Sequence, residues 1–363
     1  MTQRDLDPNL LKMYSFLVFS KLEGAVTSGM IHLGDRLGLY QSLSTFAHPV
    51  TSDELAASLQ LHPRWVQEWI HNQAAARLIE VSIDEQGIET YSMTPEAIVV
   101  LADEFHPAFG MGMFHRLPQT MAGLTALPES FRTGIGLDYD SHGPEGAVGI
   151  ERSFEPWSRS YLLPVVLPAL DGAVQRLEAG AKVADIGCGA GGAAIRMAQA
   201  FPKSSVTGYD ISRYALDRAH EKKTIDATDN VHFVDPRVSP LPNDESLDIV
   251  TAFDCIHDMT HPQDVMQAIR RSLKPDGIWL LVDIKALDTF GENMAKNPMA
   301  SLMYGISVMS CMSSAMSAPG GAGLGTLGLP ESKARSMAAA AGFTRFRKLD
   351  IEHSLNAFYE VRP

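Results

Sequence analysis

The hydrophobic positions of the N-terminal third follow helical spacing and then change to a strand-like pattern. Residues 10–40 carry apolar side chains mostly three or four positions apart, which predicts two consecutive amphipathic helices. Thr51 and Glu54 then have the spacing of a capping box, and Pro63 suits the first position of a further helix. Two β-like runs around the turn at residues 85–87 complete the pattern, which predicts a winged helix-turn-helix.

From residue 183 onward, short apolar runs alternate with helical patterns. Residues 183–186 read as a buried strand that leads through a glycine-rich turn into a helix. Residues 261–277 read as a later helix that stops at a glycine. Further strands are expected at 205–211, 231–235, 247–257, 277–285, 344–353 and 356–363. Such alternation predicts an α/β fold with an open parallel sheet, whose ligands bind at the carboxyl ends of the strands.

The connecting residues 106–180 are rich in Gly and Pro and are expected to form a helical linker that helps to build a pocket. Tyr139 and His142 stand beside turn formers, where they are candidate catalytic residues or plain surface and packing residues. Trp157 and Tyr161 are one helical turn apart and therefore share a face. They could wall a substrate pocket, and packing alone explains them equally well.

Composition and charge indicate a globular protein and disfavour nucleic acid as a binding partner. The chain has 363 residues, enough for two domains, and its 45% hydrophobic and 20% charged residues are those of a globular protein. It holds 30 Lys and Arg against 43 Asp and Glu, a net charge of −13, which disfavours nucleic-acid binding. Residues 1–105 alone hold six basic against fourteen acidic residues, a net charge of −8.

The expected recognition helix of the winged helix also lacks the side chains of a DNA reader. It offers Arg64 and Arg77 but carries Glu68 as well, and Trp65 and Trp69 mark a core-facing stripe. A groove-reading helix needs several cationic or amide side chains on its exposed face. We therefore expect this domain to serve dimerisation, giving a homodimer without a nucleic-acid partner.

The cysteines and the uncharged stretches indicate a cytoplasmic protein. Cys188, Cys255 and Cys311 lie far apart, which predicts neither a disulfide framework nor a cysteine zinc site. The first ten residues carry acids where a secretory signal carries bases. The uncharged run 297–330 is too rich in Ser and Gly for a membrane span, so no membrane partner is expected.

The glycine-rich turn after residue 186 carries the strongest chemical signal. Its glycines, Gly187, Gly189, Gly191 and Gly192, let a ligand approach the backbone closely. The next strand ends in Asp210, where an acid is placed to accept both hydroxyls of a ribose. The spacing also fits a dinucleotide site, but Asp185 stands beside the loop, and its carboxylate suits an ammonium group better than a pyrophosphate.

The segment D-x-G-C-G-x-G-G closely resembles motif I of class I S-adenosylmethionine-dependent methyltransferases, and the resemblance covers residues 160–363. It implies a Rossmann-like sheet of seven strands in the order 3-2-1-4-5-7-6 within residues 181–363, S-adenosylmethionine as cofactor and no metal. In many relatives an acid after the third strand binds the adenine, and here Asp235 is displaced toward the strand. The implied cofactor-binding residues are Asp185, Gly187, Cys188, Gly189, Gly191, Asp210, Ile211, Asp235, Phe253 and Asp254.

Two histidines follow the fourth strand of this pattern. His257 and His261 have the spacing of the H-E-x-x-H zinc motif, but that motif needs one continuous helix, and here Pro262 marks a new helix start. His257 is placed to take a proton from a substrate hydroxyl or to orient it, and a structural histidine is the alternative. The candidate catalytic residues are His257, Tyr139, His142 and His261.

Residues 286–330 form a methionine-rich insertion after the fifth strand. Methionines suit irregular apolar ligands and also fill cores. By analogy with the family, the insertion is expected to be a substrate lid. The candidate substrate-binding residues are Trp157, Tyr161, Met303, Tyr304, Ser307 and Cys311.

The layout is also similar to that of methylthiohydroxybutyrate S-methyltransferases of dimethylsulfoniopropionate synthesis. We therefore expect an enzyme that moves a methyl group to a small molecule, either to a sulfur, as in 4-methylthio-2-hydroxybutyrate, or to a hydroxyl. A hydroxyl acceptor requires a base, whereas a thioether loses no proton. The competing hypothesis is a regulator that senses S-adenosylmethionine and binds DNA through its winged helix.

Overall fold

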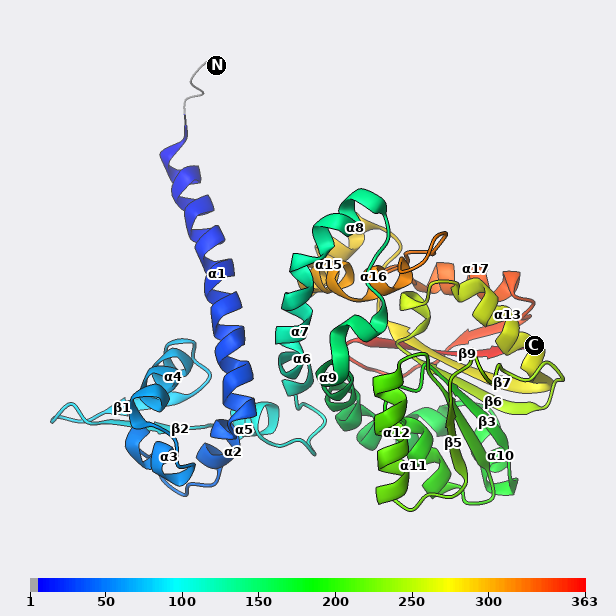
Figure 1. Cartoon of the computed structure of the whole chain (residues 1–363), viewed down its shortest axis with the longest axis horizontal. Helices are drawn as coiled ribbons and strands as arrows, with labels where there is room; N and C mark the ends of the chain where they lie inside the picture. Colours follow the sequence, from blue (N-terminus) through cyan, green and yellow to red (C-terminus); the bar gives the residue numbers. More distant parts are fainter. Residues whose placement is uncertain (1–5) are drawn as a thin grey trace. The chain divides into compact units, whose positions relative to one another are not determined.

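The computed structural model describes residues 6–363 and divides the chain into two compact units, Met1–Pro118 and Gln119–Pro363. The first five residues, which belong to the acidic N-terminus discussed above, lie outside the described residues. Figure 1 shows the first unit as helices with a small hairpin and the second as a sheet covered by helices. No helix of the described residues is long and apolar enough to cross a membrane.

The first unit is a winged helix with a long N-terminal helix. The two consecutive helices predicted over residues 10–40 are present but unequal in length, and Gly38, in the left-handed region, separates the long first helix from the short second one. The predicted capping box of Thr51 and Glu54 is present. The elements are α1 (Pro8–Arg36), α2 (Leu39–Ser44), α3 (Ser52–Ser58), α4 (Pro63–Ala75), β1 (Glu80–Ile83), β2 (Glu89–Ser92), α5 (Pro95–Leu101) and α6 (Met111–His115).

The core of this unit takes one face of α4, but Trp65, which the sequence placed with Trp69 on the core-facing stripe, is 79% exposed and lies outside that face. Val66, Trp69 and Ile70 are buried among residues of α2, α3 and β2, and the indole of Trp69 donates to the carbonyl of Met30. By contrast, the apolar side chains of the first four turns of α1 are exposed, and Phe16 keeps 73% of its surface. A helix that is apolar on all sides is normally covered.

The second unit contains the predicted seven-stranded sheet. Its order is β5-β4-β3-β6-β7-β9-β8, which is 3-2-1-4-5-7-6 when the strands of this sheet are counted along the chain, and β9 alone runs antiparallel to its two neighbours. The strands are β3 (Lys182–Ile186), β4 (Ser205–Tyr209), β5 (Val231–Val234), β6 (Leu247–Phe253), β7 (Leu273–Ile284), β8 (Arg345–Lys348) and β9 (Asn356–Arg362).

Helices cover both faces of this sheet, and each layer has its own core. The helix expected over 261–277 ends at Ser272, because the residues after it already extend along β6. The helices of the sheet region are α10 (Ala173–Ala179), α11 (Gly192–Ala200), α12 (Arg213–Ile225), η5 (Ile256–Asp258), α13 (Pro262–Ser272) and α17 (Glu331–Ala340). Those of the insertion are α14 (Phe290–Lys296), α15 (Ala300–Met309) and α16 (Cys311–Ala315).

The connecting stretch is more regular than its Gly and Pro content suggested. A nearly continuous helical segment runs through Pro156 and Pro164, because its last part adopts π-helical geometry. The elements are α7 (Leu117–Ala122), η1 (Gly123–Thr125), α8 (Leu127–Thr133), η2 (Tyr139–His142), α9 (Gly143–Trp157), η3 (Ser158–Val166) and η4 (Leu167–Ala169). Sequence spacing placed Trp157 and Tyr161 on one face, and both rings contact His353.

Ion pairs fasten α9 to the helices of the sheet. Glu155 accepts hydrogen bonds from Arg196 of α11 and from Lys222 of α12, the latter at 2.5 Å. Burial alone would raise the pKa of Glu155, but the two cations hold it below the usual glutamate value. A glutamate whose pKa is lowered on folding stabilises the protein above that usual value and less as the pH falls through the lowered one.

Glu155→Ala is expected to reduce the free energy of unfolding by about 2 kcal/mol at neutral pH, because partly buried Arg196 loses its counter-charge and Lys222 keeps only its pair with Glu151. Urea denaturation measures the loss, which should shrink in acid, where the wild-type carboxylate is itself protonated. Glu178→Ala, on the exposed surface of α10, serves as the control and should change the stability little. Equal losses at neutral and acidic pH would contradict an electrostatic origin.

Candidate functional site

The glycine-rich loop between β3 and α11 lies at the carboxyl edge of the sheet. Gly187, Gly189 and Gly191 have φ values of +63°, +54° and +75°, a region that favours glycine. A Cβ on Gly191 would lie 2.4 Å from the ring of Phe233, and one on Gly187 would lie 2.6 Å from Cβ of Cys255. A Cβ on Gly189 would meet open space. The loop is therefore packed at two positions and open to a ligand at the third.

Asp185 lies buried at the end of β3, directly before this loop. Its Oδ1 accepts a hydrogen bond of 2.7 Å from the hydroxyl of Thr251, while its Oδ2 has no hydrogen-bond partner among the described residues. Burial raises the pKa of Asp185 to about 7, despite the Thr251 hydrogen bond. A buried carboxylate oxygen without a donor is rare in proteins and fits a ligand that brings its own cationic donor.

Asp210 follows β4, one strand further along the same edge. Its Oδ2 accepts from the backbone N–H of Gly189 and its Oδ1 from that of Ser212, both at 2.8 Å. Burial raises the pKa of Asp210 above the usual aspartate value. The two N–H groups fix the carboxylate, whose remaining lone pairs can accept hydrogen bonds from a pair of vicinal hydroxyls.

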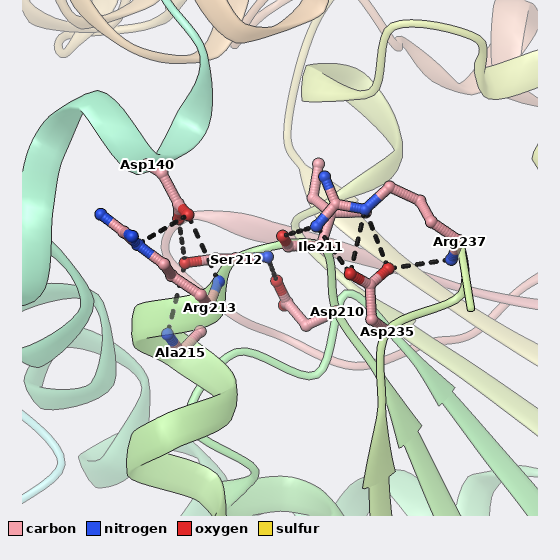
Figure 2. Close-up of polar contacts among 8 residues, drawn as sticks. All are labelled: Asp140, Asp210, Ile211, Ser212, Arg213, Ala215, Asp235 and Arg237. Atoms are coloured by element: carbon pink, nitrogen blue, oxygen red, sulfur yellow. Dashed lines mark hydrogen bonds and ion pairs between the residues drawn. The ribbon is translucent and has the colours of Figure 1, made fainter. Parts of the chain in front are cut away.

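The carboxylate of Asp235, after β5, is bonded by Arg237, a residue that was not among the predicted site residues. The guanidinium of Arg237 bonds both of its carboxylate oxygens and also donates to the carbonyl of Ile211 at 2.7 Å (Figure 2). These bonds hold the pKa of Asp235 below the usual aspartate value. The arginine thus spans the ends of β4 and β5.

The connecting stretch reaches the same edge through Asp140 of η2. Its carboxylate accepts from the hydroxyl of Ser212 at 2.5 Å and from the backbone N–H of Arg213 at 3.4 Å (Figure 2). Tyr139 and His142 flank it, and their rings lie 6.3 Å apart. The structure therefore brings the predicted loop next to the segment that follows Asp210.

His257 and Asp283 form a buried pair at the ends of β6 and β7. Nδ1 of His257 lies 2.6 Å from Oδ1 of Asp283, and both side chains are almost fully buried. Burial favours neutral imidazole, but the attraction of Asp283 outweighs it and raises the pKa of His257 well above the usual value. The aspartate fixes the ring orientation and stabilises the protonated form, the arrangement of a histidine that accepts a proton.

The insertion packs against this histidine. Gly325 donates from its backbone N–H to the carbonyl of His257, and Cys311 lies close enough to the imidazole to add to the rise of its pKa. Of the other predicted lid residues, Ser307 accepts from the backbone N–H of Thr326, Met303 accepts from the amide of Asn297, and the ring of Tyr304 lies 5.6 Å from that of Phe290. Cys311 is the predicted lid residue that reaches the histidine.

The remaining candidates occupy different surroundings. Phe253 packs against Trp157 at a ring distance of 5.4 Å. Asp254 accepts from the amide of Asn356, and burial together with nearby Asp283 raises its pKa to about 7. Burial raises the pKa of Cys188 well above the usual thiol value. His261 lies exposed at the N-terminus of α13, on a different element from His257.

Comparisons with known proteins identify two domains in the chain. Residues 177–319 match the family described as a methyltransferase domain, and residues 25–102 match an Rv2258c-like winged HTH domain. Along the chain, a winged-helix domain is thus followed by a class I methyltransferase domain. All residues that we place at the strand ends from β3 to β7 lie within the matched methyltransferase domain.

Relatives with known functions match parts of the chain. The 27-O-demethylrifamycin SV methyltransferase of Amycolatopsis mediterranei is 39% identical over 110 residues, which make up 30% of this chain and 40% of that protein. The chain thus spans less than half of that relative. The ubiquinone biosynthesis O-methyltransferase of Haemophilus ducreyi is 33% identical over 111 residues, 29% of this chain and 46% of that protein.

Solved structures match the chain over nearly its whole length, at low sequence identity. Human N-acetylserotonin methyltransferase, solved in complex with S-adenosylmethionine, has a TM-score of 0.68 at 16% identity and covers 99% of both chains. Mitomycin 7-O-methyltransferase has a TM-score of 0.66 at 18% identity and covers 98% of this chain and 99% of the other. At these identities, the likeness supports the fold of both units.

Proposed function

We propose that the protein is an S-adenosylmethionine-dependent methyltransferase that transfers a methyl group to the hydroxyl of a small molecule. The observation that carries the acceptor class is the buried pair of His257 and Asp283. A hydroxyl must lose its proton to become a strong nucleophile, and an imidazole oriented by a carboxylate accepts it. A thioether loses no proton, so the pair favours a hydroxyl over the sulfur acceptor that the sequence layout also suggested.

The residues at the strand ends fit the proposed cofactor. Asp185 would receive its ammonium group, Asp210 would accept from its ribose hydroxyls, and the backbone at Gly189 leaves room for the chain between them. When bound, the cofactor supplies a sulfonium-activated methyl group for an in-line displacement. The protein's task is then to hold the acceptor oxygen in line, to exclude water and to take the proton at His257.

The experiment that tests this proposal uses the full chain with S-adenosylmethionine labelled in its methyl group. The protein is incubated with panels of small hydroxyl, amine, thiol and thioether compounds, and the labelled products are separated and identified. We expect label in hydroxyl compounds. Label confined to thioethers would assign the sulfur acceptor instead, and no binding of S-adenosylmethionine or S-adenosylhomocysteine would refute the methyltransferase itself.

The structure of α4 supports an assembly role for the winged helix over DNA binding. Its apolar face is used in the core, and its exposed Arg64 is paired with Glu68. Few unpaired cations remain for phosphates, in line with the net charge of −8. A regulator would bind duplex DNA tightly at low salt, and fluorescence anisotropy with the full chain is expected to show no such binding.

We further propose that α1 joins two copies of the chain. Its first four turns expose a nearly uninterrupted apolar surface, made of Leu10, Leu11, Met13, Tyr14, Phe16, Leu17, Val18, Phe19 and Leu22. Lys12 and Lys21 are the only charged residues between Leu10 and Leu22. In a twofold-symmetric dimer the same surface of each copy faces the other, so an apolar helix can be covered by its own counterpart. A surface that is almost uncharged needs no partner of opposite charge.

Phe16→Glu together with Phe19→Glu is expected to convert a dimer into a monomer, because the interface would have to bury four like charges. Light scattering during size-exclusion chromatography should give twice 39.5 kDa for the wild type and 39.5 kDa for the variant. Ile225→Glu, at an exposed apolar position of α12, is the matched control and should stay dimeric. A monomeric wild type would contradict the proposal.

A further inference from the structure

The guanidinium of Arg237 lies at the carboxyl edge of the sheet and joins the residue after Asp210, Ile211, to Asp235. Its Nε lies 2.9 Å and 3.0 Å from the two carboxylate oxygens of Asp235, and its terminal nitrogen lies 2.7 Å from both Oδ2 of Asp235 and the carbonyl of Ile211. Asp235 also accepts from the backbone N–H of Arg237 at 2.8 Å. Figure 2 shows the side chain folded back from the loop after β5 toward Ile211.

These bonds use two acceptors that lie beyond Asp210 along this edge. The carbonyl of Ile211 and the carboxylate of Asp235 are both groups that could accept from the amino group of a nucleobase. Both already accept from one guanidinium. An amino group that bonded Asp235 directly would have to compete with a bidentate, charge-assisted pair. Direct reading of the base by Asp235 is therefore disfavoured.

The same bonds hold the guanidinium in a fixed plane and leave its faces available. All of these contacts use nitrogen atoms at its edge, and the Arg237 side chain is 65% exposed. Ile211, whose carbonyl accepts from this guanidinium, also has an exposed side chain, at 49%. A planar cation next to an apolar side chain forms a surface that suits the face of an aromatic base.

We infer that Arg237 contacts the nucleobase of the cofactor with the face of its guanidinium, and that Asp235 acts as a positioning residue that holds Arg237 in place. This inference rests on the proposed function, because it takes Asp210 as the ribose-binding residue. Stacking of a base on an arginine requires no particular pattern of donors and acceptors on the base. The site is thus expected to recognise an adenine by its shape and its π face more than by its amino group.

The test measures dissociation constants of the full-length protein by calorimetry for two ligands, S-adenosylhomocysteine and S-inosylhomocysteine, in which a carbonyl replaces the amino group. The wild type should bind both within about threefold, because stacking tolerates the exchange. Arg237→Ala should weaken both by about tenfold, the effect of losing one stacked cation. Asp235→Asn should weaken both by less, because Arg237 remains but is no longer held by a charge.

The matched control is Arg213→Ala. Arg213 belongs to the same edge, is exposed and pairs with a carboxylate, that of Asp140, but its guanidinium lies over the ring of Tyr214. Its removal should leave both dissociation constants unchanged. Arg237→Lys separates charge from planarity, since an ammonium keeps the ion pair but has no planar face, and it should weaken binding nearly as much as alanine.

The outcomes distinguish this inference from the proposed function. A wild type that binds neither ligand would refute the cofactor assignment itself. Wild-type binding with unchanged or tighter affinity in Arg237→Ala would overturn the inference alone, leaving Arg237 as a surface ion pair or an obstacle. A wild type that prefers the adenine ligand by more than tenfold, with the preference lost in Asp235→Asn, would show that Asp235 reads the amino group and would also overturn it.

Discussion

His257→Ala is expected to lower kcat by about 10²- to 10⁴-fold with a hydroxyl acceptor, the usual contribution of a positioned general base. The side chain is buried and its Nδ1 is held by Asp283, so alanine removes both the proton acceptor and its fixed orientation. The residues proposed to hold the cofactor lie at the ends of β3, β4 and β5, whereas His257 follows β6, and the affinity for S-adenosylhomocysteine should therefore remain close to that of the wild type. The measurement is the rate of methyl transfer at saturating cofactor.

The pH dependence gives this prediction a second readout. Although burial works against protonation, the charge of Asp283 raises the pKa of His257 well above the usual histidine value. A general base acts in its neutral form, so kcat should increase with pH through that raised value. Asp283→Asn removes the attracting charge and should move the rising limb to lower pH, while lowering the maximal rate because the protonated imidazole is less stabilised.

His261→Ala is the matched control, because His261 is exposed and lies at the start of α13. It should leave the rate and its pH profile unchanged. A mild effect of His257→Ala, with label transferred to a thioether, would assign His257 a structural role. An unfolded His257→Ala would be recognised by lost binding of S-adenosylhomocysteine, and His257→Gln, which keeps a similar volume and a polar end, then provides the same comparison.

The strands and helices of the sheet could be predicted from the sequence because their signals are local, whereas the strand order followed from the resemblance to a known family. The central strands of the second unit, such as β3 and β6, are short apolar runs, and most crossovers between parallel strands contain a helix, so alternation indicates the layers. The crossover from β5 to β6 has no helix, and β8 is mostly polar and exposed. The glycine-rich loop could also be predicted, because its glycines lie within six consecutive residues of the sequence. The site residues at this loop, Asp185 and Asp210, then followed from their positions at strand ends.

The partners of the site residues could not be predicted, because they are distant in the sequence. Asp283 lies 26 positions after His257 and reads as a polar interruption in an apolar strand. Asp140 is 72 positions before Ser212, and only the folded chain brings the two together. Asp283 interrupts an apolar strand that was expected to lie beside the strand of His257, and this pattern could have indicated a buried acid near the histidine. Nothing in the spacing indicated that Arg237 would occupy both Asp235 and Ile211.

Asp185→Asn is expected to weaken the binding of S-adenosylhomocysteine by about tenfold to a hundredfold, because the ligand's ammonium group loses a charged acceptor in a buried site. The amide keeps the shape and can still meet the Thr251 hydroxyl, so the fold should persist. Asp248→Asn is the matched control. Asp248 lies near the start of β6 and bonds Lys182 and Lys274 at the opposite edge of the sheet, so its replacement should leave the affinity unchanged.

The affinity of the wild type should also depend on pH in a direction that the burial of Asp185 determines. In the free protein, burial raises the pKa of this carboxyl to about 7. A bound ammonium group favours the ionised carboxylate, so the pKa falls on binding, and below pH 7 binding must release a proton. The dissociation constant should therefore be flat just above pH 7 and rise by up to about tenfold for each unit below it. Calorimetry in buffers of different ionisation enthalpy measures the released proton directly. Asp185→Asn should abolish both the proton release and the slope, and a slope that persists in this variant would assign the titration to another group.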